Sequence, residues 1–227
     1  MVDGLALLAG LQLADSFFPS GLFTQSHGLE QFVALGTHGP DQVGALLRAY
    51  LLQVVGPADA VALRWVMRAE GQLSEVGLID QRLDALKMSS ESREGSRRSG
   101  RAVLTVGQTA FADGRAQQYA TQVNAGTYPG HHAIAVGLLL GRAGLDEATA
   151  VLCELHAVAA GWLAAAVRLG ALDYVQAQTL LHATAPWLVA AAAIGQDVHW
   201  TDMGGWAPLI DIRQMQHAAS ESRLFAS

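Results

Sequence analysis

The sequence predicts an all-α protein, and three observations support this prediction. Hydrophobic residues make up 51% of the 227 positions and charged residues only 15%, a balance typical of a well-buried helical domain. Apolar residues recur at helical spacing along most of the chain, and no segment of useful length alternates as a strand would. Neither a linker nor an internal repeat divides the sequence. We therefore expect residues 1–227 to form one compact bundle of roughly nine to eleven helices.

Charge and cysteine content limit the setting in which the protein works. The net charge is −6 and the single lysine is Lys87, so we expect no binding to nucleic acid or to an anionic membrane. The lone Cys153 favours a reducing cytoplasm. No basic region precedes the apolar start of the chain, and we judge the run Ala157–Val167 too short to span a bilayer. We expect a soluble cytoplasmic protein.

The first predicted helix, Leu5–Ala14, is apolar nearly all round. Such a helix has to be buried on two sides, either in the core or at an interface with another subunit. A sharp corner follows it, where Pro19 ends the helix and Ser20 can cap the next one. Three phenylalanines lie within seven residues of this corner, so we expect it to be buried or covered by a partner: Phe17, Phe18 and Phe23.

The next helices follow from periodicity and from Gly and Pro punctuation. We expect a second helix from about Phe23 to Leu35. A third should begin at Pro40, be broken at Gly56-Pro57, and be followed by a fourth that starts at Asp59. A further helix should extend from about Ser74 to Met88.

Residues 89–100 have the composition of a linker but the spacing of a helix. Ser92, Ser96, Ser99 and Val103 lie on one helical face, and Glu94 can pair with Arg98. A ridge of arginines lies beside the serines, and it is either a solvated face or a surface for carboxylates. It comprises Arg93, Arg97 and Arg101.

The second half continues the helical pattern. We expect helix from about Leu104 to Val123 with a possible break at Asp113-Gly114, and then a turn at 127–130. An apolar helix at Ala133–Leu140 and a long one from Leu145 to about Gly170 should follow. Asp173 should cap the next helix, and Pro186 should kink or restart it.

The tail, residues 204–227, begins with a Gly-Gly interruption and then carries large apolar residues in a place where chains ordinarily fray. Interleaved apolar and basic side chains suggest a tail ordered by docking, either on its own domain or on a partner. The large apolar residues are Leu209, Ile210, Ile212, Met215, Leu224 and Phe225.

Catalytic and metal-binding motifs are absent from the sequence. It has no phosphate-binding loop with a Gly-Lys-Ser/Thr end, no dinucleotide-binding glycine motif, no HExxH and no CxxC. Cys153 and His156 share a helical face, so a helical-bundle enzyme using them with Glu154 is the alternative. We assign no catalytic residue, metal ligand or cofactor.

Several blocks resemble the urease accessory protein F family, UreF, in the family's order. They are LQLADS, Pro-x-Gly-x-Phe at 19–23, Ser-x-Gly-Leu-Glu at 26–30, SREGSRRSGRAVL, His131 or His132 followed by AIAVGLL, AAAVRLGALD and DIRQMQHAASESRLFAS. Two places differ from the family pattern. Gln25 stands where many members carry a His, and 174–181 lacks a common Gly-Gln pairing.

The resemblance implies an all-α, cytoplasmic, homodimeric accessory protein without turnover of its own. It would join the scaffold UreD (also called UreH) and the GTPase UreG, dock on apo-urease and regulate GTP-dependent nickel insertion. From the matching blocks we expect the partner-binding residues to be Asp15, Phe23, Ser26, Glu30, Arg97, Arg213, Met215, His217, Arg223, Leu224 and Phe225.

Overall fold

A computed structural model describes residues 3–69, 72–112, 114–220 and 222–226, and over these ranges the chain is helical with no strand. The described ranges contain twelve α-helices, and since α3 and α4 belong to one continuous helix these form eleven rods, as the sequence predicts. They are α1 (Gly4–Ala14), α2 (Leu29–Ala34), α3 (Gly39–Tyr50), α4 (Ala60–Arg68), α5 (Leu73–Leu86), α6 (Ser90–Ala110), α7 (Gly114–Asn124), α8 (His132–Arg142), α9 (Glu147–Arg168), α10 (Tyr174–Ala183), α11 (Ala185–Ile194) and α12 (Pro208–Ala218).

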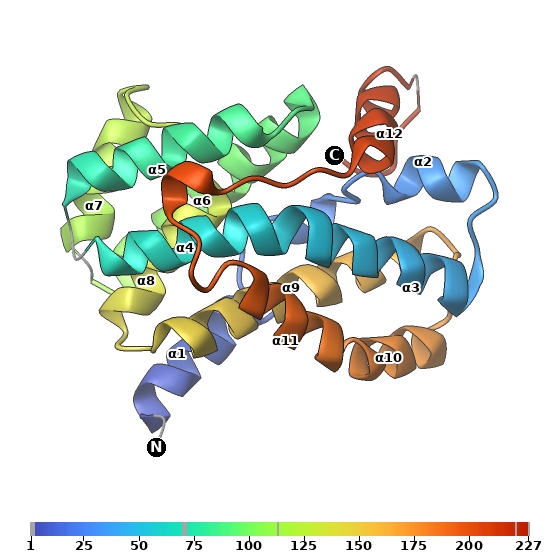
Figure 1. Ribbon diagram of the computed structural model, residues 1–227, viewed down its shortest axis with the longest axis horizontal. Helices are drawn as coiled ribbons and strands as arrows, with labels where there is room; N and C mark the ends of the chain where they lie inside the picture. Colours follow the sequence, from blue (N-terminus) through green and yellow to red (C-terminus); the bar gives the residue numbers. More distant parts are fainter. Residues whose placement is uncertain (1–2, 70–71, 113, 221, 227) are drawn as a thin grey trace.

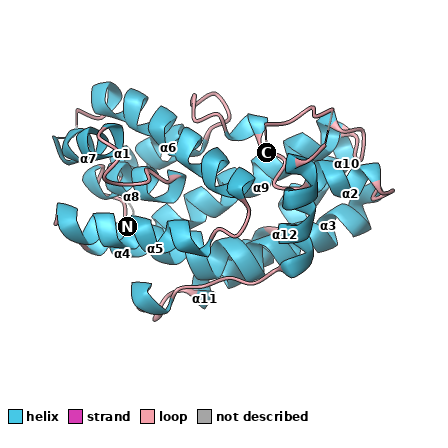
Figure 2. Cartoon of the chain, turned by 90° about the horizontal axis from the view of Figure 1, so that it is seen from above, coloured by secondary structure: helices cyan, strands magenta, loops and turns pink. Residues whose placement is uncertain are grey.

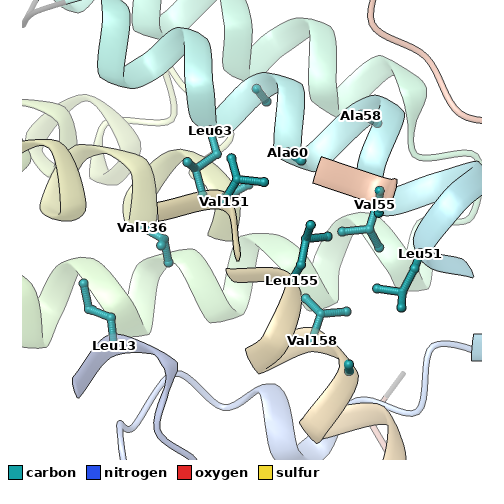
Figure 3. Packing of buried hydrophobic residues seen from close by; sticks show 14 of the residues in the cluster. Leu13, Leu51, Val55, Ala58, Ala60, Leu63, Val136, Val151, Leu155 and Val158 are labelled. Carbon is teal, nitrogen blue, oxygen red and sulfur yellow. The ribbon is translucent and has the colours of Figure 1, made fainter. Parts of the chain in front are cut away.

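The core lies where α4, α8 and α9 meet. Leu63, Val136 and Leu155 from these three helices are buried, and Figure 3 shows them in one cluster of apolar side chains. Helix α6 also packs on α8, and α11 packs against residues Leu51–Asp59, which join α3 to α4. Figures 1 and 2 place α12 beside α2, at the opposite end of the bundle from the N-terminus. One layered core therefore holds nearly every helix.

The expected break at Gly56-Pro57 is wrong. The helix continues from Gly39 to Arg68, and its middle, Leu51–Asp59, is a π-helix (η2) that contains Pro57. Proline cannot donate to the carbonyl four residues earlier, which is that of Gln53, and the wider π turn accommodates its ring. The N–H of Trp206 donates to the Gln53 oxygen instead, at 2.9 Å. The proline thus opens a docking point for the loop that leads to α12.

Glycines at this crossing allow backbones to approach closely. A Cβ on Gly205 would lie 2.6 Å from the Gln53 oxygen, and a Cβ on Gly56 would lie 2.9 Å from the Ala191 oxygen of α11. From the sequence, Gly56 and the Gly204-Gly205 pair are both expected to break regular structure. Gly56 lies inside the helix and permits close packing, whereas Gly204-Gly205 does interrupt the helices.

The expected helix from Phe23 to Leu35 is also wrong as a single element. A 3-10 turn (η1, Leu22–Thr24) comes first and α2 begins only at Leu29. His27 and Gly28 have positive φ angles of 50° and 86°, which no helix contains. Ser20 does not cap an α-helix. Its hydroxyl accepts a weak 3.3 Å hydrogen bond from Leu22 N in the turn.

Helix α6 confirms that residues 89–100 are helical. Ser89 caps it by accepting from Ser92 N at 3.0 Å, and Ser96, Ser99 and Val103 are buried together on one face. Glu94 pairs with Arg97 at 2.8 Å and not with Arg98 as expected. The expected break near Asp113 falls between α6 and α7, although Asp113 itself lies outside the described residues.

The later helices follow the sequence with small shifts. Asp146 caps α9, so this helix begins at Glu147 and not at Leu145. Asp173 caps α10 as expected and forms a reciprocal capping box with Gln176. Pro186 lies at the start of α11, which is bent by 46° from α10.

Helix α1 is buried on one side only. Ala6, Gly10 and Leu13 face the bundle, whereas Leu5 and Leu8 are 79% and 63% exposed. Core packing therefore accounts for half of this apolar helix, and the other half is uncovered. Of the two interpretations of this helix, core packing leaves Leu5 and Leu8 exposed, whereas an interface with another subunit would bury them.

Among the described residues, two helices are long and apolar enough to cross a bilayer, so the expectation that no segment is long enough is wrong. These are Gly39–Arg68 and Glu147–Arg168, and α10 with α11 would pass as a bent pair. More than half of the apolar window in each of the two long helices is buried inside the bundle, 56% and 61%. Their hydrophobicity is thus used in core packing.

Close approach of α6 to the α7–α8 turn yields a matched pair of predictions. A Cβ on Gly100 would lie 2.1 Å from Gly130 O, whereas one on Gly161 of α9 would meet nothing within 4 Å. We expect Gly100→Ala to lower the free energy of unfolding by about 2 kcal/mol or more. Gly161→Ala should raise it by ~0.5–1 kcal/mol through helix propensity. Urea unfolding of both variants measures this, and equal effects would contradict the packing described.

Candidate interaction site at the C-terminal tail

The carboxylate of Glu30 is the centre of a polar cluster that holds the tail. Glu30 lies in the first turn of α2, and its two oxygens accept hydrogen bonds from the N–H groups of Leu224 (2.7 Å) and Phe225 (3.0 Å). Nε2 of His217 lies 2.8 Å from Oε2 of the same carboxylate. Burial alone would raise the pKa of Glu30, but these hydrogen bonds outweigh it and lower the pKa below its usual value.

His217 joins three segments of the chain. Its ring is fully buried on α12, and its second nitrogen, Nδ1, lies 2.8 Å from Oε1 of Glu91 in the first turn of α6. Arg223 approaches the same Glu91 oxygen at 3.4 Å. We call the group Glu30, Glu91, His217, Arg223 and Phe225 the tail clasp. It ties α2, α6 and the tail together through side chains that are distant in sequence.

The aromatic ring of Phe225 completes the clasp. It is 3% exposed, and the guanidinium carbon of Arg168 on α9 lies 4.3 Å from its centroid. The same arginine donates to the carbonyl of Phe23, and Ala226 N donates to Thr24 O at 2.8 Å. The last described residues are thereby fixed to the corner after α1.

Helix α12 is held along its length as well. Gln214 accepts from the Ser89 hydroxyl at 2.9 Å, Ser220 accepts from Gln31 at 2.7 Å, and Arg213 lies 5.7 Å from the Phe32 ring centroid. Of the two docking alternatives for the tail, the structure therefore shows it packed on its own domain. This docking leaves an apolar strip outside, comprising Leu209 (53% exposed), Ile212 (47%), Met215 (45%) and Leu224 (57%).

A sequence model of the UreF family matches residues 37–185. The chain belongs to the UreF family. It is 36% identical over 223 residues to the urease accessory protein UreF of Trichodesmium erythraeum, with 97% of this chain and 96% of the relative covered. It is 30% identical to the proteins of that name from Corynebacterium efficiens (97% and 96% covered) and Paenarthrobacter aurescens (97% of each). The resemblance found in the sequence blocks is confirmed.

The structure brings together several of the residues expected to bind partners in this UreF-family chain. Glu30, His217, Arg223 and Phe225 belong to the tail clasp, and Leu224 and Met215 belong to the exposed strip beside it. Arg213 lies on the same helix, and the Phe23 side chain is 59% exposed at the adjoining corner. This part of the expected set is one continuous region.

The remaining expected residues lie elsewhere or are enclosed. Asp15 ends α1 and accepts from Phe17 N at 2.8 Å. Ser26 is fully buried, and its hydroxyl has no partner among the described residues. Arg97 pairs with Asp84 at 2.6 Å, so much of the predicted arginine ridge is used in internal contacts. The hydrogen bond with His131 is the largest cause that lowers the pKa of Asp84, to about 2. Burial acts in the opposite direction, and the hydrogen bonds from Arg97 lower the pKa further.

Glu91 and Arg168 are the members of this site that sequence reasoning missed. Glu91 precedes the buried serines of α6 and belongs to no repeating pattern in the sequence. Its partner His217 is 126 residues away, too far for local spacing to indicate the contact. Arg168 lies inside the block AAAVRLGALD, which could have marked it. Gln25 has a structural role: it is 4% exposed and donates to Gly95 O at 3.0 Å, which joins the corner to α6.

The alternative site at Cys153 has no catalytic geometry. Burial raises the pKa of the Cys153 thiol, the reverse of what a nucleophile needs. His156 is exposed, and Glu154 is engaged with His132 at 3.2 Å. Within the described ranges, no three His, Cys, Asp or Glu side chains are grouped so as to hold a metal ion. Nothing in this geometry supports the enzyme interpretation.

We predict that Glu30→Ala releases the tail. The change removes three hydrogen-bond acceptances and leaves His217 facing only Glu91, a loss of ~2–4 kcal/mol of docking free energy. Tryptic cleavage after Arg223 should accelerate tenfold or more. Glu94→Ala, which removes an exposed carboxylate from α6, is the matched control and should leave the rate unchanged. Equal cleavage rates in the two variants would refute the clasp.

His27 generates a prediction about acid stability. Burial, followed by the charge of Lys87, lowers the pKa of His27 from 6.5 to about 4, and its Nδ1 lies 3.0 Å from the Tyr50 hydroxyl. The folded state therefore resists protonation, so the free energy of unfolding should fall by ~3 kcal/mol as pH drops from about 6.5 to 4. Asn tolerates a positive φ, so His27→Asn should fold and flatten this dependence.

Urea unfolding at several pH values measures the acid effect. The control is His182→Asn on α10, which removes an exposed histidine. If both variants keep the wild-type slope between pH 6.5 and pH 4, His27 is not the responsible group.

Proposed function

We propose that this chain is a non-catalytic urease accessory protein of the cytoplasm that bridges the UreD/UreH scaffold and the UreG GTPase. In this role it regulates GTP-dependent nickel insertion into apo-urease. Family membership and the names of its relatives support the urease connection. The observation that carries the bridging role is the tail clasp, because it presents an ordered apolar strip on the protein surface.

The strip suits protein recognition better than chemistry. Leu209, Ile212 and Met215 recur three residues apart on α12, so they lie along one side of the helix. About half of each residue is exposed, although the opposite side of α12 is held by the contacts of Gln214 and His217. Ordering these groups before binding reduces the entropy cost of association. A partner that covers them gains apolar burial without first having to fold the tail.

A second uncovered surface supports a homodimer. Leu8, Leu11, Phe17, Pro19 and Val106 line a cavity of 460 Å³ between α1, the corner and α6. The Phe17 side chain is 93% exposed at its edge. A protruding ring and a receiving cavity on one face are what a two-fold symmetric contact requires. We assign the subunit interface to this face.

The proposal predicts that the tail strip is needed for assembly. The double variant Ile212→Ser/Met215→Ser should weaken binding to UreD/UreH or UreG tenfold or more, because interface cores depend on a few apolar anchors. The matched control is Val189→Ser/Ile194→Ser on α11, which removes two exposed apolar groups (61% and 42%) away from the tail. Co-expression with the two partners, followed by size-exclusion chromatography, measures co-elution.

Each outcome of this experiment decides something. Loss of co-elution in the α12 variant alone supports the bridge. Equal behaviour of both variants would remove the tail strip from the interface. Absence of any complex with the well-folded wild-type chain would refute the bridging role. Retained binding of UreD/UreH without UreG would favour a bare dimeric scaffold with no GTPase contact.

A further inference from the structure

In the tail clasp, the His217 ring lies between two carboxylates, and a neutral imidazole cannot donate a hydrogen bond to both of them. Both ring nitrogens of His217 lie 2.8 Å from carboxylate oxygens, one of Glu30 and the other of Glu91. A neutral imidazole offers one N–H and one lone pair, and an ionised carboxylate only accepts. With a neutral ring, one of the two contacts would place a lone pair against a lone pair. The geometry therefore requires one additional proton, carried on the ring or on Glu91.

The charges around the ring do not remove this requirement. Glu30 faces His217 from α2 and Glu91 faces it from α6, while Arg223 of the tail reaches Glu91 at 3.4 Å with its own side chain 43% exposed. Arg168 of α9 is directed at Phe225 and the Phe23 carbonyl. The second oxygen of Glu91 is buried and has no partner among the described residues. A single long contact from Arg223 thus leaves Glu91 incompletely neutralised.

We propose that the tail clasp binds one proton when the tail docks, so that the tail is a latch that opens as the solution becomes more alkaline. Alkaline solution removes the shared proton to water and leaves His217 neutral between two carboxylates. The neutral ring can donate to only one of Glu30 and Glu91, so the cluster that fixes Glu30 as the acceptor of the Leu224 and Phe225 N–H groups loosens, and the tail detaches from the corner. No other covalent change or co-reactant is needed.

This latch would control whether the α12 strip is presented, and in that respect it rests on the proposed function. The proton step itself concerns only the isolated chain. Because docking takes up one proton, the equilibrium constant for docking falls tenfold per pH unit. This fall begins at the pH above which the undocked cluster has lost that proton. The direction is opposite to the acid loss expected from His27, so the two effects are separable on the pH axis.

Amide hydrogen exchange of the full-length protein tests the latch. We expect the protection factors of Leu224, Phe225 and Ala226, corrected for intrinsic exchange, to fall by up to tenfold per pH unit at the upper end of the range from about pH 6 to pH 9. Amides in the middle of α9 serve as the internal reference and should keep their protection.

Glu91→Gln is the decisive variant. Its amide can donate to Nδ1 of neutral His217 while Nε2–H donates to Glu30, so the tail should stay protected at about pH 9 without an additional proton. Glu94→Gln, an exposed neighbour on the same helix, is the matched control and should follow the wild type. Preserved α9 protection shows that each variant is folded.

Two results would overturn the latch: tail protection in the wild type that stays constant from about pH 6 to pH 9, or the same alkaline loss in Glu91→Gln as in the wild type. A pH-dependent tail in a chain that binds no accessory partner would instead refute the proposed function and leave the latch standing. The two proposals therefore fail separately.

Discussion

The Glu30 carboxylate is the interaction on which the end of this structure depends. A partly buried carboxylate is costly unless its oxygens are satisfied, and those of Glu30 receive an imidazole nitrogen and two backbone N–H groups. In return, these contacts fix a segment that has only one buried aromatic anchor of its own, Phe225. Without the carboxylate, residues 222–226 would contribute too little apolar burial to offset the entropy of ordering them.

The route by which the tail reaches Glu30 depends on a second constraint, which lies in the long helix. Pro57 deprives Gln53 O of its helical donor, and the loop before α12 satisfies that oxygen through Trp206 N. Gly205 lets the two backbones meet at this point. A residue that sequence rules treat as a helix breaker thus serves as a bracket for another segment. The helix persists because its two ends are packed on different helices, α3 on α10 and α4 on α8.

Titratable side chains in this protein serve mainly to position backbone. Asp80 is fully buried and accepts from Tyr119, Gly130 N and His131 N, which anchors the turn before α8 to α5. Burial raises the pKa of Asp80 despite these bonds. His132 lies between Ser99 and Glu154 in the same manner. Such clusters fix the turn before α8 on α5 and hold α8 against α6 and α9.

The sequence alone determined the all-α class, the single bundle, the helical nature of residues 89–100 and membership of the UreF family. These features follow from local periodicity and from blocks of residues, both of which are written in the order of the chain. It also indicated that Glu30, His217, Arg223 and Phe225 matter, through the resemblance of two blocks at opposite ends. Helix boundaries set by capping residues, such as Asp173, were equally local and equally accessible.

Only the tertiary structure decided how those blocks meet. The pairing of Glu91 with His217 spans 126 residues, and no periodic pattern encodes a contact of that separation. The split of the expected Phe23–Leu35 helix arises because Tyr50 and Trp162 pack against the His27 ring, and the uninterrupted passage through Pro57 arises because another segment satisfies Gln53. In each case a partner distant in the chain supplies the free energy that overrides a local preference, so local rules alone could not predict the outcome.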